Sequence, residues 1–360
     1  MALFAGRDYP GSYAELRAWF NEDWKCLDYL DWLRWPDGFV CPWCASQDRW
    51  RAPSGRWRCV GCDRRVSATA GTIVHGTRTP LTLWCSAAWH LTSGKGGISA
   101  AELRREMHLG SYQTVWAMLH RYRSVMVRPG RNRFTGDVEV DESFLGGPEA
   151  GIPGRGALGK VPFAAAVKVN SPSGFCRARL GVIKDASAAS LQQSLLDNVE
   201  PGSCILTDGW AAYPKAIRGR YTRKATSVSA SGRPAHEALP GVHLVFSLVK
   251  RWVMGTLHGS ISAERMPAYF DEWVFRRAAA THAAAACSFS VSSSRPLKAT
   301  HSPTTSCARP AGPDHRHHHR TANACVRPAS NAKIPVYPGA TTQPDHSRKL
   351  RQRDGDPLLE

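Results

Sequence analysis

Four cysteines stand in two closely spaced pairs near the N-terminus. Cys41 and Cys44 form one C-x2-C pair, and Cys59 and Cys62 form a second pair after a fourteen-residue spacer. Two such pairs facing each other supply the four thiolates of a tetrahedral zinc site. Because all four ligands are protein sulfur, no position is left for water, and we expect the zinc to be structural. Two disulfides or an iron site are the alternatives.

Two aspartates farther along the chain are candidates for metal-assisted phosphoryl chemistry. Asp141 lies in VEVDESFLGG, where apolar and polar residues alternate as in a strand, and Asp208 ends the apolar run SCILTD. Acids at strand ends of an α/β domain are well placed to share divalent cations, and two ions about 4 Å apart can clamp the attacking and leaving oxygens. Taken alone, an aspartate at a strand end is more often a turn residue or a helix cap.

The elements that must position these residues follow from periodicity. Residues 12–35 carry apolar side chains at helical spacing, and residues 36–75 form short stretches punctuated by cysteine. The helical pattern returns from 79 to 126, with Ser99 as an expected N-cap and a tight turn at HLGSY. We expect a helix-turn-helix there, with Arg121 and Arg123 contacting phosphates; a helical hairpin without a ligand is the alternative.

From 137 to 275 strand-like and helix-like stretches alternate, which predicts a mixed α/β domain around a central sheet. After Arg276 the sequence is dominated by Ala, Ser, Thr, Pro, His and Arg, a composition that predicts disorder. The expected organisation is therefore a helical segment at 1–36, a zinc ribbon at 37–76, a helical DNA-binding segment at 77–130, the α/β domain at 137–276 and a disordered tail at 277–360.

The charge balance points to a polyanionic partner. The chain carries 47 Lys and Arg against 29 Asp and Glu, a formal net charge of +18, which favours nucleic acid over a merely soluble surface. No run of eighteen apolar residues occurs, and the N-terminus lacks the pattern of a signal peptide, so we expect no membrane partner. An odd number of cysteines, eleven, fits a disulfide framework badly and predicts a cytoplasmic protein.

Several separate motifs, taken in order, resemble the bacterial DDE-type insertion-sequence transposases with an N-terminal zinc ribbon, the ISXO-like group. The resemblance runs from about residue 20 to residue 276, roughly 70% of the length. The matching motifs are FVCPWC with WRCVGC, SATAGTIVHGTRTPL, VEVDESFLGG, LTDGWAAY, LPGVHLVFSLVKRWVMGTLHG and YFDEWVFR. Several motifs in the right order are far more specific than any one of them.

The resemblance implies a ribonuclease H-like catalytic domain that uses Mg²⁺ or Mn²⁺, with Asp141 and Asp208 as the first two ligands. It also implies hydrolysis at the element's end, which frees a 3′ hydroxyl that then attacks target DNA. Lys250 and Arg251 would contact DNA near the site. The partners would be element-end and target DNA, joined by a homo-oligomer of at least two copies in the bacterial cytoplasm, at the nucleoid.

Two features depart from the family pattern. Many relatives carry Asn, and some Glu, between Ser247 and Lys250, where this chain has Leu248 and Val249, so His243 and Glu272 are the candidates for the third ligand and His258 is a further one.

The second departure is at the C-terminal end of the resemblance. The family's Glu and first Arg are matched by Glu272 and Arg276, and Arg276 is a further candidate for DNA contact, but position 279 is Ala where a second Arg is expected. Composition changes at the same place, which indicates a frameshifted C-terminus. The competing functions are a decayed transposase, or a zinc-ribbon regulator, that binds DNA without cutting it.

Overall fold

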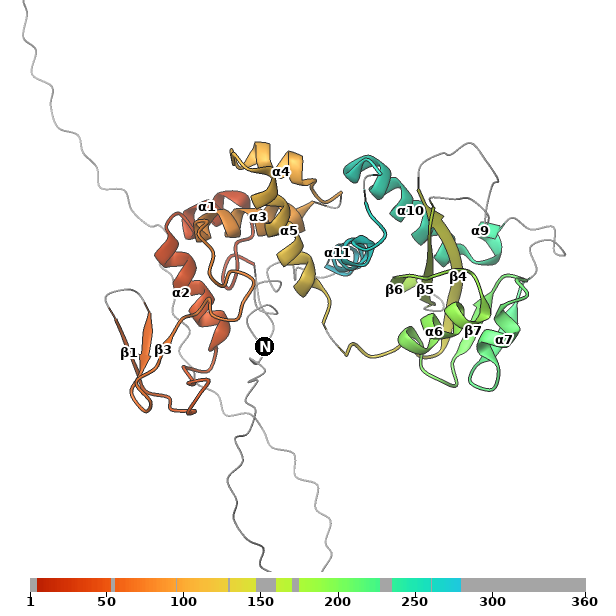
Figure 1. Cartoon of the computed structure of the whole chain (residues 1–360), viewed down its shortest axis with the longest axis horizontal. Coiled ribbons are helices and arrows are strands. Elements are labelled where there is room, and N and C mark those ends of the chain that lie inside the picture. Colours follow the sequence, from red (N-terminus) through yellow and green to blue (C-terminus); the bar gives the residue numbers. More distant parts are fainter. Residues whose placement is uncertain are drawn as a thin grey trace, which may run out of the picture. The chain divides into compact units, whose positions relative to one another are not determined.

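The computed structural model describes residues 5–52, 56–94, 96–128, 130–146, 160–169, 175–226, 235–259 and 261–279 (Figure 1). The tail predicted to be disordered, 277–360, lies outside these residues except for its first three positions. Within the described ranges, no helix is both long and apolar enough to cross a bilayer.

Five helices near the N-terminus share one hydrophobic core. They are α1 (Tyr13–Trp19), α2 (Asp23–Arg34), α3 (Leu81–Ser93), α4 (Ala100–Glu106) and α5 (Tyr112–Met126). Leu30 of α2, Leu91 of α3 and Leu119 of α5 are all buried in this core. Segments 1–36 and 77–130, predicted as separate units, therefore pack together around a single apolar centre.

The pair α4 and α5 has the form expected of a helical hairpin. The hydroxyl of Ser99 accepts a hydrogen bond from the amide of Glu102, and Ser111 does the same for Thr114, so each helix begins at a side-chain cap. Leu103 of α4 is buried with α5 in the shared core. DNA binding by this hairpin stays a prediction.

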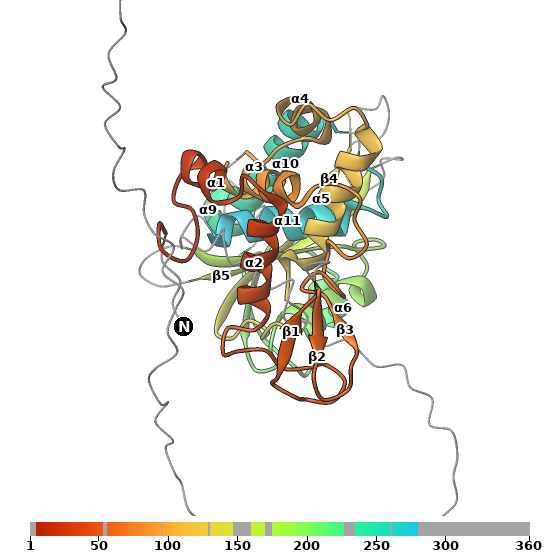
Figure 2. The same ribbon diagram turned by 90° about the vertical axis from the view of Figure 1, so that its left-hand side faces the viewer.

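Three short strands form the ribbon that carries the cysteine pairs. They are β1 (Arg49–Arg51), β2 (Trp57–Cys59) and β3 (Arg65–Val66), antiparallel in the order β1-β2-β3. The ribbon lies against α2 (Figure 2), where Arg49 makes two hydrogen bonds to the carboxylate of Asp31, at 3.0 and 2.8 Å. Its own core is small and centres on Phe39, Val66 and two of the cysteines.

A five-stranded mixed sheet forms the centre of the α/β domain. Its strands are β4 (Asp137–Leu145), β5 (Val161–Val169), β6 (Phe175–Val182), β7 (Cys204–Thr207) and β8 (Thr222–Ala225), in the order β6-β5-β4-β7-β8. The first three strands are antiparallel neighbours, and β7 and β8 add to the other side of β4 in parallel. This order confirms the expected ribonuclease H-like class.

Helices cover both faces of the sheet because β4 is apolar or buried on both sides (Figure 1). On one face, Val138 and Val140 pack with α6 (Ala188–Asn198) and α7 (Tyr213–Ile217). On the other, Leu145 packs with α10 (Pro240–Leu257) and α11 (Met266–Ala279). A short helix, α9 (Ala235–Ala238), precedes α10. The odd-numbered residues of β4 thus face α10, and this assignment decides which acids share a site.

A buried ion cluster joins α5 to α11. Nε of Arg123 lies 2.6 Å from one carboxylate oxygen of Glu272, and Nε of Arg276 lies 3.2 Å from the other. Arg123, Glu272 and Arg276 are 2%, 0% and 5% exposed, respectively. The expectation that Arg123 and Arg276 contact DNA is therefore wrong for this conformation, because both guanidinium groups are inside the protein and face a carboxylate.

Candidate active site and zinc centre

The two predicted aspartates belong to neighbouring strands: Asp141 lies on β4, and Asp208 directly follows the end of β7 at Thr207. In the parallel pairing of β4 with β7, Asp137 is opposite Cys204 and Glu139 is opposite Leu206. Continuing this register by two residues leads to Asp141 on β4 and to Asp208, the first residue after β7. Adjacent strands are about 4.8 Å apart, and opposed residues of a parallel pair point to the same face. Asp141 therefore faces α10 with the other odd-numbered residues of β4, and the charge of Asp208 acts on the pKa of His243 in that helix.

Local hydrogen bonds orient each carboxylate. Oδ1 of Asp141 accepts the amide of Glu142 at 2.8 Å, and Oδ1 of Asp208 accepts the amide of Trp210 at 3.0 Å. Asp141 is 8% exposed. Each aspartate uses one oxygen to bind its own backbone, which fixes the direction of the side chain.

His243, in the first turn of α10, lies beside Asp141. Its Nε2 lies 3.6 Å from Oδ2 of Asp141. Burial lowers the pKa of His243, with the charge of His236 acting in the same direction, while the carboxylate of Asp208 opposes them. The imidazole is therefore biased toward its neutral form, which is the form that binds metal ions.

Glu139 anchors the helix that carries His243. The amide of Val242 donates to Oε2 of Glu139 at 2.8 Å, and α10 has no side-chain cap of its own. Burial raises the pKa of Glu139, whereas the amides of Val242 and Gly241 lower it. A buried carboxylate from β4 thus takes the place of an N-cap and holds the first turn of α10 over the sheet.

The opposite face of β4 is held by a second buried acid. The hydroxyl of Tyr213 in α7 donates to Oε2 of Glu142 at 3.0 Å. Burial and the nearby charge of Glu142 raise the pKa of Tyr213 well above its usual value, so the phenol stays protonated as a donor. Glu142 therefore belongs to the support beneath the aspartates and not to the cluster itself.

The four cysteines converge as the spacing predicts. Their sulfur atoms all lie within 4.8 Å of one another, with 3.7 Å between Cys41 and Cys62 and 3.4 Å between Cys44 and Cys59. A disulfide would need about 2.05 Å, whereas thiolates about 2.3 Å from a tetrahedral zinc stand about 3.8 Å apart. The geometry favours a structural zinc over two disulfides.

The two cysteine turns are built alike. Ala45 and Asp63 each follow the second cysteine of a pair, and their φ angles are 58° and 57°. The amide of Ala45 donates to the carbonyl of Cys41, and that of Asp63 to the carbonyl of Cys59, both at 3.0 Å. Each pair thus sits on a tight turn of the same kind, and the two turns present their sulfur atoms to one centre.

Comparison with known proteins decides the family. A profile of the ISXO2-like transposase domain matches residues 133–278, and a profile of the transposase zinc-ribbon domain matches residues 21–65. The chain belongs to the ISXO2-like transposases with an N-terminal zinc ribbon. A solved structure, the Mos1 strand transfer complex, aligns at 13% identity over 56% of this chain and 77% of that chain, with a TM-score of 0.21. No curated protein matches the sequence.

The other residues predicted as third ligand of the transposase lie in different surroundings. Glu272 has both carboxylate oxygens paired with Arg123 and Arg276, so it is a partner of arginines and not of the aspartates. Leu248 and Val249, at the expected position of the third ligand, pack in the core beneath α10. His258 has a left-handed backbone and forms the C-cap of the same helix. His243 is the sequence-predicted candidate that the structure brings to Asp141.

Three predicted DNA contacts are exposed. Lys250 and Arg251 lie on α10 beyond His243, and Arg121 lies on α5. Loss of solvation and the charge of Lys160 lower the pKa of Lys250, while Asp141 opposes them, so Lys250 shares the electrostatic environment of the aspartates. Arg121 donates to the carbonyl of Ile73 at 3.0 Å, which ties it to the segment between ribbon and α3.

Proposed function

We propose that this transposase cuts and rejoins DNA, and that Asp141, Asp208 and His243 are its divalent-metal ligands. The observation that carries the proposal is the contact of His243 with Asp141 at 3.6 Å, together with the position of Asp208 at the end of β7, the strand that pairs with β4 in parallel. The family supports a transposase in general. The ligand set and the reaction are proposed from the geometry.

The donor set fits a divalent cation. Two carboxylates supply hard oxygen ligands suited to Mg²⁺ or Mn²⁺, and an imidazole is accepted more readily by Mn²⁺. His243 is biased toward the neutral form. When bound between such ligands, divalent ions stabilise the charge on the attacking and leaving oxygens of a phosphodiester.

The chain's own groups would hold and orient the DNA. Lys250 is exposed seven residues after His243 on α10, two helical turns away on a similar face, so its ammonium group can contact a phosphate beside the aspartates. The reaction would begin with hydrolysis at the element's end, and the 3′ hydroxyl formed would attack target DNA. Bringing two ends together requires at least two copies of the chain.

The test is nicking of a supercoiled plasmid that carries both ends of the element, with Mn²⁺ or Mg²⁺. We expect Asp141→Asn and Asp208→Asn to abolish nicking while DNA binding persists. Asp197→Asn, an exposed carboxylate of α6, is the matched control and should nick like the unmodified chain. Nicking that survives Asp141→Asn would exclude the proposed ligand set.

His243 is tested separately because it is the ligand that departs most from the family pattern. We expect His243→Ala to lose nicking, and His243→Glu to restore it with a shift in preference from Mn²⁺ toward Mg²⁺. Equal activity of the alanine variant would remove His243 from the site. A chain that binds element ends but never nicks them under any of these conditions would support the competing function, DNA binding without cleavage.

A further inference from the structure

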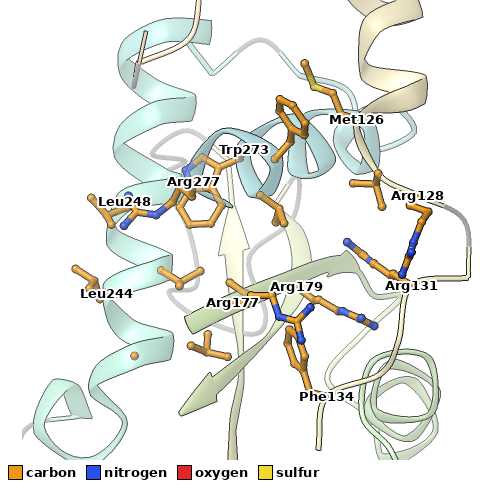
Figure 3. Close-up of a pocket in the computed structure, with 17 residues that line it drawn as sticks. Met126, Arg128, Arg131, Phe134, Arg177, Arg179, Leu244, Leu248, Trp273 and Arg277 are labelled. Atoms are coloured by element: carbon orange, nitrogen blue, oxygen red, sulfur yellow. The ribbon is translucent and has the colours of Figure 1, made fainter. Parts of the chain in front are cut away.

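A cavity of about 320 Å³ opens at the outer edge of the sheet, where β6 is the last strand (Figure 3). Five arginines line it, two from the segment after α5, two from β6 and one from α11, and they are Arg128, Arg131, Arg177, Arg179 and Arg277. We call these five residues the arginine pocket. Its apolar lining includes Phe134 and Trp273.

The surroundings of Arg179 in the arginine pocket are backbone carbonyls and other arginines. It is 4% exposed, and its guanidinium group donates to the backbone carbonyls of Asn132 and Asn198. Burial lowers the pKa of Arg179 to about 10, and the further causes are the positive charges of Arg131, Arg177 and Arg133. Buried charges in proteins are normally paired, so an arginine surrounded by carbonyls and other arginines favours an external anion.

Aromatic rings hold two of the other guanidinium groups in place. The guanidinium carbon of Arg177 lies 5.5 Å from the ring centre of Phe134, and that of Arg277 lies 5.2 Å from Trp273. Burial lowers the pKa of Arg131, and the carboxylate of Asp271 opposes this effect. One carboxylate beside five arginines leaves a strong positive excess.

The sequence that follows the described residues is also basic. Residues 280–360 contain eleven Lys and Arg but five Asp and Glu, so that segment is itself basic. The pocket is also distinct from the aspartates. Helix α10 turns His243 toward Asp141, while Leu244 and Leu248 line the pocket.

We infer that the arginine pocket binds backbone phosphates of the DNA that the transposase holds, as a second DNA contact beside the cluster of Asp141, Asp208 and His243. Guanidinium groups match phosphate geometry, and each phosphate they neutralise releases counterions into the solvent. The inference rests on the proposed function only in taking DNA as the partner. It needs no cleavage.

The test is the salt dependence of binding to a fluorescent DNA duplex of arbitrary sequence. The variant is Arg177→Ala with Arg277→Ala, since both side chains are exposed and neither has a carboxylate partner among the described residues. The slope of log affinity against log salt is negative, and it should become less steep by roughly 2, since each phosphate that is no longer neutralised removes about 0.9 from its magnitude. Because the removed charges repel their neighbours, the melting temperature without DNA should stay equal or rise.

The matched control is Arg218→Ala with Arg220→Ala, two exposed arginines of the same domain outside the pocket. Its slope should match that of the unmodified chain. An unchanged slope in the pocket variant, or an equal fall in the control, overturns the inference.

The nicking assay keeps the two proposals apart. If the unmodified chain never nicks plasmid but the pocket variant has a less steep slope, the arginine pocket is supported as a DNA contact and the proposed reaction is refuted. If nicking is normal and depends on Asp141 but the slope is unchanged in the pocket variant, the proposed reaction is supported and the arginine pocket is refuted as a DNA contact.

Discussion

Replacing Glu272 with glutamine should destabilise the protein far more than loss of an ordinary ion pair. Glu272 balances Arg123 at 2.6 Å and Arg276 at 3.2 Å, and all three side chains are at most 3% exposed. Removing the one carboxylate leaves two buried positive charges close together. Breaking a buried pair in this way costs about 3–5 kcal/mol. By contrast, an exposed pair is worth about 0–1 kcal/mol.

The assay is urea unfolding followed by tryptophan fluorescence, with Asp28→Asn as the control. Asp28 pairs with Arg51 at 2.9 Å, but those side chains are 34% and 40% exposed, so its loss should be nearly neutral.

A third variant, with Met at positions 123, 272 and 276, removes all three charges and should regain most of the lost stability. If Glu272→Gln shifts the free energy of unfolding by less than about 1 kcal/mol, the cluster is not buried as the structure has it and the reasoning fails.

Two further predictions concern metal and pH. The chain should bind one zinc ion, measured by elemental analysis, and Cys59→Ser should lose it and unfold the ribbon, because the ribbon has little other core; retained zinc would contradict the four-cysteine site. Burial, with Arg123 and Arg265 nearby, lowers the pKa of His120 to about 4. Since the unfolded chain takes up this proton near pH 6.5, stability should fall by roughly 2–3 kcal/mol between pH 6.5 and 4. His120→Phe should flatten that fall in melting curves.

The parts of the site that local patterns encode could be predicted from the sequence. Cysteine spacing indicates the zinc centre, because both pairs sit on short turns whose geometry depends on a few neighbouring residues. Asp141 and Asp208 stand out because each ends or interrupts an apolar strand pattern. The approach of Asp208 to β4 depends on the tertiary pairing of β7 with β4, which a strand pattern alone does not contain.

The misplaced residues are those whose role depends on a distant partner. Arg123 is expected on DNA because an arginine on a helix is usually solvated, and its partner Glu272 lies 149 residues away. The role of Glu139 could not be predicted because a polar residue in an alternating strand is normally exposed. The amide that donates a hydrogen bond to its carboxylate belongs to Val242, 103 residues later. Nothing near either residue in the sequence signals the contact.

Helical phase favours His243 among the candidates for the third ligand. His243, Ser247 and Lys250 are spaced by four and three residues, so they share one face of α10, whereas Val249 and Phe246 turn into the core. Val249, at the expected position of the third ligand, thus points away from the face that carries His243, and Ser247 donates to the carbonyl of His243 at 2.9 Å within that turn.

The aspartates and His243 are held by different kinds of structure, and this difference sets which part of the site is most easily lost. Asp141 and Asp208 are fixed by a sheet with neighbours on both sides of β4 and β7. His243 depends on one helix end that lacks a side-chain cap of its own and is tied to the sheet by the carboxylate of Glu139. A lost cap costs only about 0.5–2 kcal/mol of stability, but a displacement of about 1 Å at a reacting centre can cost roughly 100-fold in rate. Glu139 therefore matters more for the position of His243, the proposed third ligand, than for the stability of the fold.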